Sequence, residues 1–271
     1  MKIMVGKIHH NDELRTSAQA ARVAQVVKGL TKNHIDVTSI VDVWFQPPVP
    51  PASNGVMTRF RAGRLDFEQE KFSMFESRRR RGNPKPPGLR KWIRLSRHIV
   101  KNFFDTHSSE VIARRIFIEK ILTEKHIFLW TGLANSDATG ALIFEDDFEI
   151  PSAESVTKLV KVLSQYGASA DLIDLAGGYS RQALGLPEAP GQDLELELLV
   201  ANTTCAYFIG KQLAQKLVQL AFENPKAKRL GVDFFIPYAN RGETHWRTVL
   251  PAELPFVHGS FHGGVPSSIR G

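Results

Sequence analysis

Residues 2–45 alternate between two strand-like runs and one helical run, and this order limits the fold more than any other part of the sequence. The run KIMVGKI at 2–8 is mostly apolar and predicts a short strand. Residues 12–30 contain many good helix formers and predict a helix that Gly29 ends. Residues 34–45 are rich in Val, Ile and Thr and predict a second strand. A strand–helix–strand opening indicates an α/β fold with a parallel or mixed sheet.

The same alternation continues through the second half of the chain. Short apolar runs predict further strands at 141–144, 171–177 and 203–210. Helical periodicity predicts helices at 108–133, 151–167 and 211–222. We expect Ser108 or Ser109 to cap the first of these helices, and Ser152 and Gly167 to begin and end the second. The pattern predicts one α/β domain over residues 1–271, a mixed sheet flanked by helices.

The positive charge of the chain is concentrated in one segment. The formal net charge is +7, but residues 59–101 hold 14 Lys or Arg and 4 Asp or Glu, so that 14 − 4 = +10. Four prolines between positions 47 and 51 precede this segment, and Arg78–Arg81 lie within it. We predict that residues 47–101 form a basic, Pro-rich insertion, with helical periodicity returning at 89–104. Three interpretations stay open: a solvated loop, a lid over a donor diphosphate, or a contact with an anionic membrane or glycolipid.

The cysteine count and the apolar runs bear on the compartment. Cys205 is the one cysteine, which excludes an intramolecular disulfide, and we expect it to pack in the run TTCAYFIG. The N-terminal run is too short for a signal peptide, and no run approaches the roughly 18 apolar residues that span a bilayer. The expectation is a cytoplasmic protein with peripheral contact at the inner face of the membrane.

Three consecutive acids follow the apolar strand ALIF: Glu145, Asp146 and Asp147. The end of a strand in an α/β sheet lies at the edge where ligands bind. Three adjacent carboxylates there need positive charge nearby, and a divalent cation such as Mn²⁺ or Mg²⁺ is the simplest source. The alternative is that the acids begin a solvated turn or favour the N-terminus of the next helix. The pattern alone does not separate these two interpretations.

An ordered series of motifs resembles glycosyltransferase family 25, a family of GT-A enzymes that builds bacterial lipooligosaccharide and related sugar chains. ALIFEDDFEI resembles the Glu-Asp-Asp signature of that family. Upstream, KHIFLW supplies His126 and Trp130, with Lys125 where the family usually has Ser. Downstream follow TTCAYFIGKQLAQKLV with Tyr207 and Ala214, then GVDFFIP, then GVPSSIRG. The family usually begins with a strand and a turn that includes an arginine, and the first third of this chain retains a strand and Arg15.

The resemblance implies a Rossmann-like GT-A fold and a metal-dependent transfer of a sugar, galactose by default, from a UDP-sugar to a glycan or glycolipid such as lipopolysaccharide, with inversion. It implies that Asp147 binds the metal, and that Asp146 and Glu145 support the metal or the nucleotide. Asp233 is the candidate general base, or alternatively the cap of a helix that begins at Phe234. The remaining candidates are His258 and His262 as metal ligands, and Lys7, His9 and Arg15 beside the nucleotide.

Two other classes of protein compete with this interpretation. A nucleic-acid-binding protein could use Arg78–Arg81 and Trp92, although no zinc spacing or RNA-recognition signature accompanies them. A metal-dependent nucleotidyltransferase would share the sheet and the acids, but GKIHHND is a poor phosphate-binding loop. His126 and Trp130 lie one helical turn apart, which also fits packing beside a site.

Overall fold

The computed structural model describes most of the chain outside residues 45–91. Its described residues are 1–9, 13–44, 92–93, 96–97, 100, 106–178, 184, 189, 191–201, 204–225, 227–241 and 245–259, with the side chains of 106–116, 229 and 241 left out. The predicted insertion at 47–101 therefore lies outside the described residues except for five helical positions, Trp92, Ile93, Ser96, Arg97 and Val100. His262 also lies outside them.

The centre of the fold is a seven-stranded mixed sheet with the order β2-β1-β3-β7-β5-β8-β6. β1, β2, β3, β5 and β8 run in one direction, and β6 and β7 run in the opposite direction. A separate two-stranded ribbon pairs β4 with β9. The strands are β1 Lys2–Ile8, β2 Asp36–Val43, β3 Gly140–Glu145, β4 Phe148–Glu149, β5 Leu172–Asp174, β6 Leu194–Leu196, β7 Ala206–Gly210, β8 Thr248–Leu250 and β9 Val257–His258.

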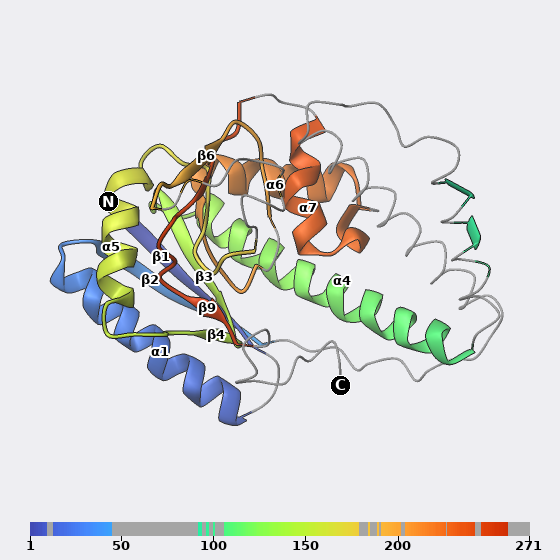
Figure 1. Ribbon diagram of the computed structural model, residues 1–271, viewed down its shortest axis with the longest axis horizontal. Coiled ribbons are helices and arrows are strands. Elements are labelled where there is room, and N and C mark those ends of the chain that lie inside the picture. Colours follow the sequence, from blue (N-terminus) through green and yellow to red (C-terminus); the bar gives the residue numbers. More distant parts are fainter. Residues whose placement is uncertain are drawn as a thin grey trace.

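Helices cover both faces of the sheet, as Figure 1 shows. Helices α1 (Glu13–Lys32) and α5 (Ser155–Tyr166) lie on one face, and α4 (Thr106–Ala134), α6 (Lys211–Glu223) and α7 (Val232–Tyr238) lie on the other. Short 3-10 helices at Ala227–Leu230 and Ala239–Arg241 flank α7. Alternate residues of β3 point into the two apolar cores, Ile143 toward α4 and α6 and Phe144 toward α1 and α5. The predicted α/β class with a mixed sheet and flanking helices is confirmed.

Three predicted helix boundaries are wrong. Gly29 lies inside α1, which continues to Lys32, and its missing side chain leaves room for Val156 of α5. Ser108 and Ser109 lie inside α4, which begins at Thr106. Ser152 does not cap α5: the helix begins at Ser155, and it is the Ser155 hydroxyl that accepts a hydrogen bond from the Ser152 N–H. Gly167 follows the last residue of α5, as predicted.

One edge of the sheet collects most of the candidate site residues. The parallel strands β1, β2 and β3 end there at Ile8, Val43 and Glu145, which are paired or neighbouring in register. β5 ends at the same edge with Asp174. Because β7 is antiparallel, its beginning rather than its end lies at this edge, which brings Thr204 and Cys205 beside Glu145. Among the described residues, no helix has both the length and the apolar composition needed to cross a membrane.

Candidate functional site

The three consecutive acids point to three different surroundings. Glu145 is the last residue of β3, and Asp146 and Asp147 form the turn before β4. The main-chain N–H of Glu145 donates to the carbonyl of Cys205 at 2.8 Å, which joins β3 to the start of β7. Each of the three acids therefore has its own set of partners.

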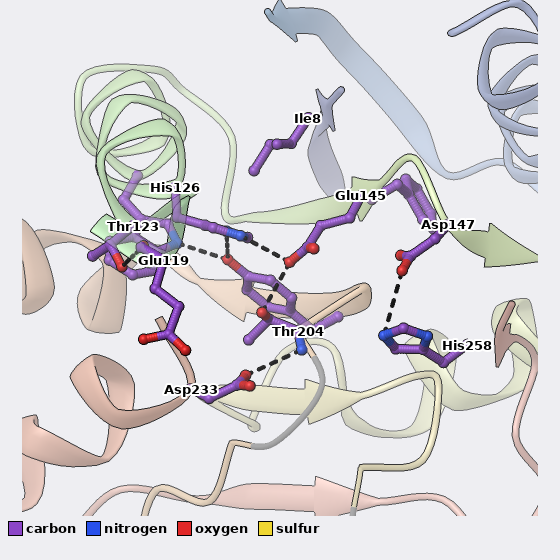
Figure 2. A network of polar contacts seen from close by, with 12 residues as sticks. Ile8, Glu119, Thr123, His126, Glu145, Asp147, Thr204, Asp233 and His258 are labelled. Atoms are coloured by element: carbon purple, nitrogen blue, oxygen red, sulfur yellow. Dashed lines mark hydrogen bonds and ion pairs between the residues drawn. The ribbon is translucent and has the colours of Figure 1, made fainter. Parts of the chain in front are cut away.

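Glu145 ends a chain of buried hydrogen bonds, shown in Figure 2. Its Oε1 lies 3.1 Å from His126 Nε2 and accepts a hydrogen bond from the Thr204 hydroxyl at 2.9 Å. His126 Nδ1 lies 2.7 Å from the Tyr207 hydroxyl, which accepts a hydrogen bond from Trp130 Nε1 at 3.0 Å. All of these side chains except that of Glu145 are buried almost completely.

The direction of the chain follows from the charge of His126. Burial lowers the pKa of His126 to about 3, so its ring is neutral near neutral pH and carries one N–H. The carboxylate of Glu145 can only accept, so the N–H is on Nε2 and the Tyr207 hydroxyl donates to Nδ1. Each donor and acceptor then has a partner, from Trp130 through Tyr207 and His126 to Glu145. The arrangement holds the Glu145 carboxylate rigidly.

Asp146 is surrounded by cations of the protein itself. Its Oδ2 lies 3.9 Å from the Arg15 guanidinium, and Arg22 donates to its main-chain carbonyl at 2.9 Å. Lys125 is fully buried and donates to the carbonyl of His9 at 2.8 Å. Burial lowers the pKa of Lys125, and the nearby charges of Asp146 and Glu145 partly offset this shift. Asp146 is buried and is not one of the residues whose ligand atoms converge on a candidate metal site.

Asp147, Cys205 and His258 form that candidate metal site. Their ligand atoms all lie within 4.8 Å of one another, and Asp147 Oδ2 lies 3.5 Å from His258 Nε2. The Asp147 and His258 side chains are 15% and 17% exposed, whereas Cys205 is 1% exposed. Burial and four nearby carboxylates, with Asp147 first among them, raise the pKa of the Cys205 thiol well above its ordinary value. One carboxylate, one imidazole and one thiol are a donor set that suits a divalent cation of the first transition row.

Main-chain hydrogen bonds hold these three residues in place. β4 pairs with β9 through Phe148 and His258, and the Gly259 N–H donates to the Asp147 carbonyl at 2.8 Å. Cys205 is tied to the neighbouring Glu145 through its own carbonyl. Asp147 and Cys205 lie in turns directly before β4 and β7, and His258 lies on β9, so the ends of paired strands hold all three ligands in position.

Asp233 lies in the first turn of α7, whose first residue is Val232. Its Oδ1 accepts a hydrogen bond from the main-chain N–H of Thr204 at 3.2 Å. The alternative of Asp233 as the cap before Phe234 is wrong, because Gly231 occupies the cap position, with φ of 76°. In Figure 2, Asp233 and the Asp147–His258 pair lie on opposite sides of Thr204. Thr204 thus joins Asp233 to Glu145, through its N–H on one side and its hydroxyl on the other.

Of the other residues predicted from the sequence, Lys7 and His9 lie at the end of β1, and Arg15 lies near the start of α1. Lys7 Nζ is 2.6 Å from Asp42 Oδ2, and His9 Nε2 is 2.9 Å from Asp42 Oδ1. His9 Nδ1 lies 3.1 Å from the Thr16 hydroxyl. Arg15 forms an ion pair with Asp146, whereas Lys7 and His9 pair with Asp42. Lys7 and His9 form a separate polar cluster at the same edge of the sheet.

Sequence reasoning missed Thr204, Cys205 and Tyr207 as site residues. The run TTCAYFIG was correctly predicted as a strand, but its first residues reach the site only because β7 runs antiparallel. Lys125 was noted only as a departure from a family pattern, and the structure places its ammonium against the end of β1. Lys125 precedes Glu145 by 20 residues in the sequence, so no local pattern pairs this lysine with the acids.

Comparison of the sequence with models of known protein families and with curated proteins finds no match. The functional assignment therefore depends on the motifs and on the geometry described above.

Proposed function

We propose that the protein is a metal-dependent glycosyltransferase that moves a sugar from a UDP-sugar to a hydroxyl of a glycan or glycolipid acceptor, with inversion. The observation that carries the proposal is the pairing, at one sheet edge, of a candidate metal site at Asp147 and His258 with a second carboxylate, Asp233, across Thr204. Sugar transfer from a nucleotide donor needs these two functions close together: one for the diphosphate and one for the attacking hydroxyl.

The convergence of separate sequence motifs supports this proposal. His126 and Trp130 come from one motif of the resemblance, Glu145 from a second, Tyr207 from a third and Asp233 from a fourth. Hydrogen bonds join the first four in a single buried chain, and Thr204 links that chain to Asp233. Residues that are distant in the sequence thus share one site, as members of one catalytic centre would.

The residues that would hold a divalent cation are Asp147 and His258, for which Mn²⁺ or Mg²⁺ is the expected ion of a GT-A enzyme. When bound, the ion would neutralise the charge of the departing diphosphate. Arg15 lies beside Asp146 at the same edge and is suited to an anionic phosphate. Lys7 and His9, at the end of β1, are the proposed contacts of the nucleotide.

Asp233 is the proposed general base. Its carboxylate would take the proton of the acceptor hydroxyl as that oxygen attacks the anomeric carbon of the donor. The Thr204 N–H fixes one of its oxygens, and Glu145 in turn holds the Thr204 hydroxyl. In this proposal Glu145 is a positioning residue: it acts on Asp233 through Thr204. The galactosyl donor and the lipopolysaccharide-type acceptor follow from the resemblance alone, and a location at the inner face of the membrane is proposed from the basic segment at 59–101.

The experiment that tests the proposal is a thermal-shift screen of nucleotide sugars with and without Mn²⁺, followed by a transfer assay on the best donor. We expect a UDP-sugar to raise the melting temperature only with the metal present. Asp147→Ala should remove that metal-dependent shift and the transfer activity while the protein stays folded. Asp137→Ala is the matched control and should behave as wild type. Asp137 is exposed and precedes the start of β3, at the end of the strand away from the candidate site. Full activity of Asp147→Ala would refute the metal assignment.

Asp233→Asn separates binding from chemistry. We expect the metal-dependent thermal shift with the donor to remain, and the turnover number to fall by about 10²–10⁴-fold, the usual contribution of a general base. The turnover number and the donor KM measured under saturating acceptor give the answer. Normal turnover would reduce Asp233 to a structural residue of α7. Release of pyrophosphate instead of UDP would favour a nucleotidyltransferase.

A further inference from the structure

The thiol of Cys205 is the one feature of the candidate metal site that an oxygen-binding Mg²⁺ centre does not need. It lies in the same group as the Asp147 carboxylate and the His258 imidazole, with all ligand atoms within 4.8 Å. Thiolate and imidazole are ligands of Zn²⁺, Co²⁺ and similar ions, whereas Mg²⁺ prefers six oxygen ligands. A sulfur at this position therefore changes which ion the site selects.

The separation of the three groups is close to that of a bound set. Ligand atoms that share a tetrahedral ion at bond lengths of about 2.0–2.3 Å lie roughly 3.3–3.8 Å from one another. The Asp147 and His258 atoms already lie 3.5 Å apart. A movement on the order of 1 Å by the Cys205 side chain would bring all three onto one ion.

The three candidate ligands differ in their exposure to solvent. Cys205 is almost completely buried, whereas Asp147 and His258 keep part of their surface exposed. An ion would enter from the side of the carboxylate and the imidazole, with the sulfur behind it. Three protein ligands and one open side is the composition of a catalytic zinc-type centre rather than of a closed structural one.

We propose that Cys205 is a metal ligand, and that Asp147, Cys205 and His258 together bind a thiophilic divalent cation, Zn²⁺ or Co²⁺, in preference to Mg²⁺. The inference shares Asp147 and His258 with the proposed function, but it concerns metal binding and does not require sugar transfer. Cys205 is the one cysteine of the chain, so a thiolate–metal signal can come from no other residue.

Optical titration of the full, untagged chain with Co²⁺ tests the proposal, because a cobalt–thiolate bond gives a charge-transfer band in the near ultraviolet. We expect the band to grow to saturation at one ion per chain, to disappear when Zn²⁺ is added, and to persist when Mg²⁺ is added at the same concentration. Cys205→Ala should remove the band and weaken Zn²⁺ binding by about tenfold or more. The titration is repeated with UDP, which supplies oxygen ligands.

Three further variants make the result specific. Asp147→Ala and His258→Ala should each weaken Co²⁺ binding, whereas His245→Ala, an exposed histidine of the same C-terminal region, should not. Cys205→Ser retains the size of the buried side chain and should bind Co²⁺ without the band. Circular dichroism shows whether each variant is folded. If a Cys205 variant does not fold, the wild-type spectrum still decides the question, because the chain has no other cysteine that could give the band.

The outcomes distinguish this inference from the proposed function. Co²⁺ bound without the band, with or without UDP, overturns the role of Cys205 and leaves Asp147 and His258 as metal ligands. Failure to bind Zn²⁺ or Co²⁺ under either condition, or tighter binding of Mg²⁺, overturns the inference as well. The band without any UDP-sugar transfer would support the inference and count against the proposed function.

Discussion

At the scale of single residues, the acid triplet is stabilised mostly by the protein itself. Glu145 is held by His126 and Thr204, and Asp146 lies among Arg15, Arg22 and Lys125. Asp147 is the member whose carboxylate meets metal-ligating side chains. The sequence-based expectation that one cation compensates all three acids therefore gives way to a division of roles, in which Asp147 is the acid that belongs to the candidate metal site.

The hydrogen bonds of Tyr207 give the first prediction at this scale. Its hydroxyl is the common partner of Trp130 and His126, both of which are completely buried. Tyr207→Phe leaves two buried polar groups without their partner, so we expect the free energy of unfolding to fall by about 1–3 kcal/mol. Urea denaturation followed by circular dichroism measures this change.

Tyr238→Phe is the matched control for Tyr207→Phe. The Tyr238 hydroxyl accepts a hydrogen bond from the Asn224 side chain at 2.7 Å, but the site is only partly buried, so water can replace the lost hydroxyl. A smaller loss than that of Tyr207→Phe is expected. Equal losses in the two variants would mean that the buried chain contributes nothing beyond an ordinary tyrosine hydrogen bond.

Asp174 gives a prediction about pH. Burial raises its pKa to about 6, although three main-chain N–H groups, from Ala176, Gly177 and Gly178, bond to the carboxylate. In the unfolded chain the pKa is about 3.9. Between these two values the folded protein binds more protons than the unfolded chain, so the contribution of Asp174 to stability increases as pH falls from about 6 toward about 4.

Comparison with Asp174→Asn isolates this contribution, because asparagine does not titrate. The free energy of unfolding of wild type minus that of the variant should increase as pH falls through this range, by up to about 3 kcal/mol. Parallel urea denaturation of both proteins at several pH values gives the difference. A difference that is constant with pH would show that Asp174 is not perturbed.

At the scale of secondary-structure elements, the close approach of α1 and α5 explains why a predicted helix end was wrong. A Cβ on Gly29 would lie 2.1 Å from Val156 Cγ1, far closer than two non-bonded carbon atoms can approach. Gly29 is thus a packing residue in the body of α1, where it costs helix propensity and permits the contact. The sequence pattern could not separate this role from that of a helix terminator.

Gly29→Ala should therefore destabilise the protein, by about 1–3 kcal/mol, because the two helices must move apart. Val156→Ala removes the clashing methyl groups, and the double variant should recover most of the loss from Gly29→Ala. Gly132→Ala in α4 is the control: the nearest atom to its added Cβ would be Met4 Sδ at 3.8 Å. There the substitution should be neutral or stabilising by about 0.5–1 kcal/mol.

At the scale of the whole molecule, the charge is divided between two parts of the chain. Residues 59–101 carry +10 and the remainder about −3, since the total is +7. The candidate site lies in the part with the acidic balance, where Arg15 and Arg22 of α1 lie against Asp146. A separate contact of the basic segment with an anionic surface remains a prediction, because residues 59–101 lie almost entirely outside the described residues.

Replacement of Arg78–Arg81 with glutamine tests that contact. Each basic residue near an anionic membrane contributes about 1 kcal/mol, so binding to phosphatidylserine-containing vesicles should weaken by about tenfold or more. Binding to phosphatidylcholine vesicles should be weak for both proteins, and higher salt should reduce the difference. Vesicle co-sedimentation measures the partition.

The control removes the same charge elsewhere. Glutamine at Lys28, Lys32, Lys158 and Lys161, on α1 and α5, should change vesicle binding much less. If the two variants behave alike, the membrane contact depends on net charge and not on the basic segment. Tight, salt-sensitive binding of the wild type to duplex DNA or RNA, lost in the Arg78–Arg81 variant, would favour the nucleic-acid alternative.

The sequence by itself determined the local elements: the opening strand–helix–strand unit, the buried strand before the acids, and the helices that follow. These depend on periodicity and on residue type, both of which are properties of neighbouring residues. Only the tertiary structure decided the direction of β7 and the packing of α1 on α5. Strand direction and helix contact depend on partners far along the chain, and for that reason no local pattern predicted that Cys205 and Thr204 would lie in the site.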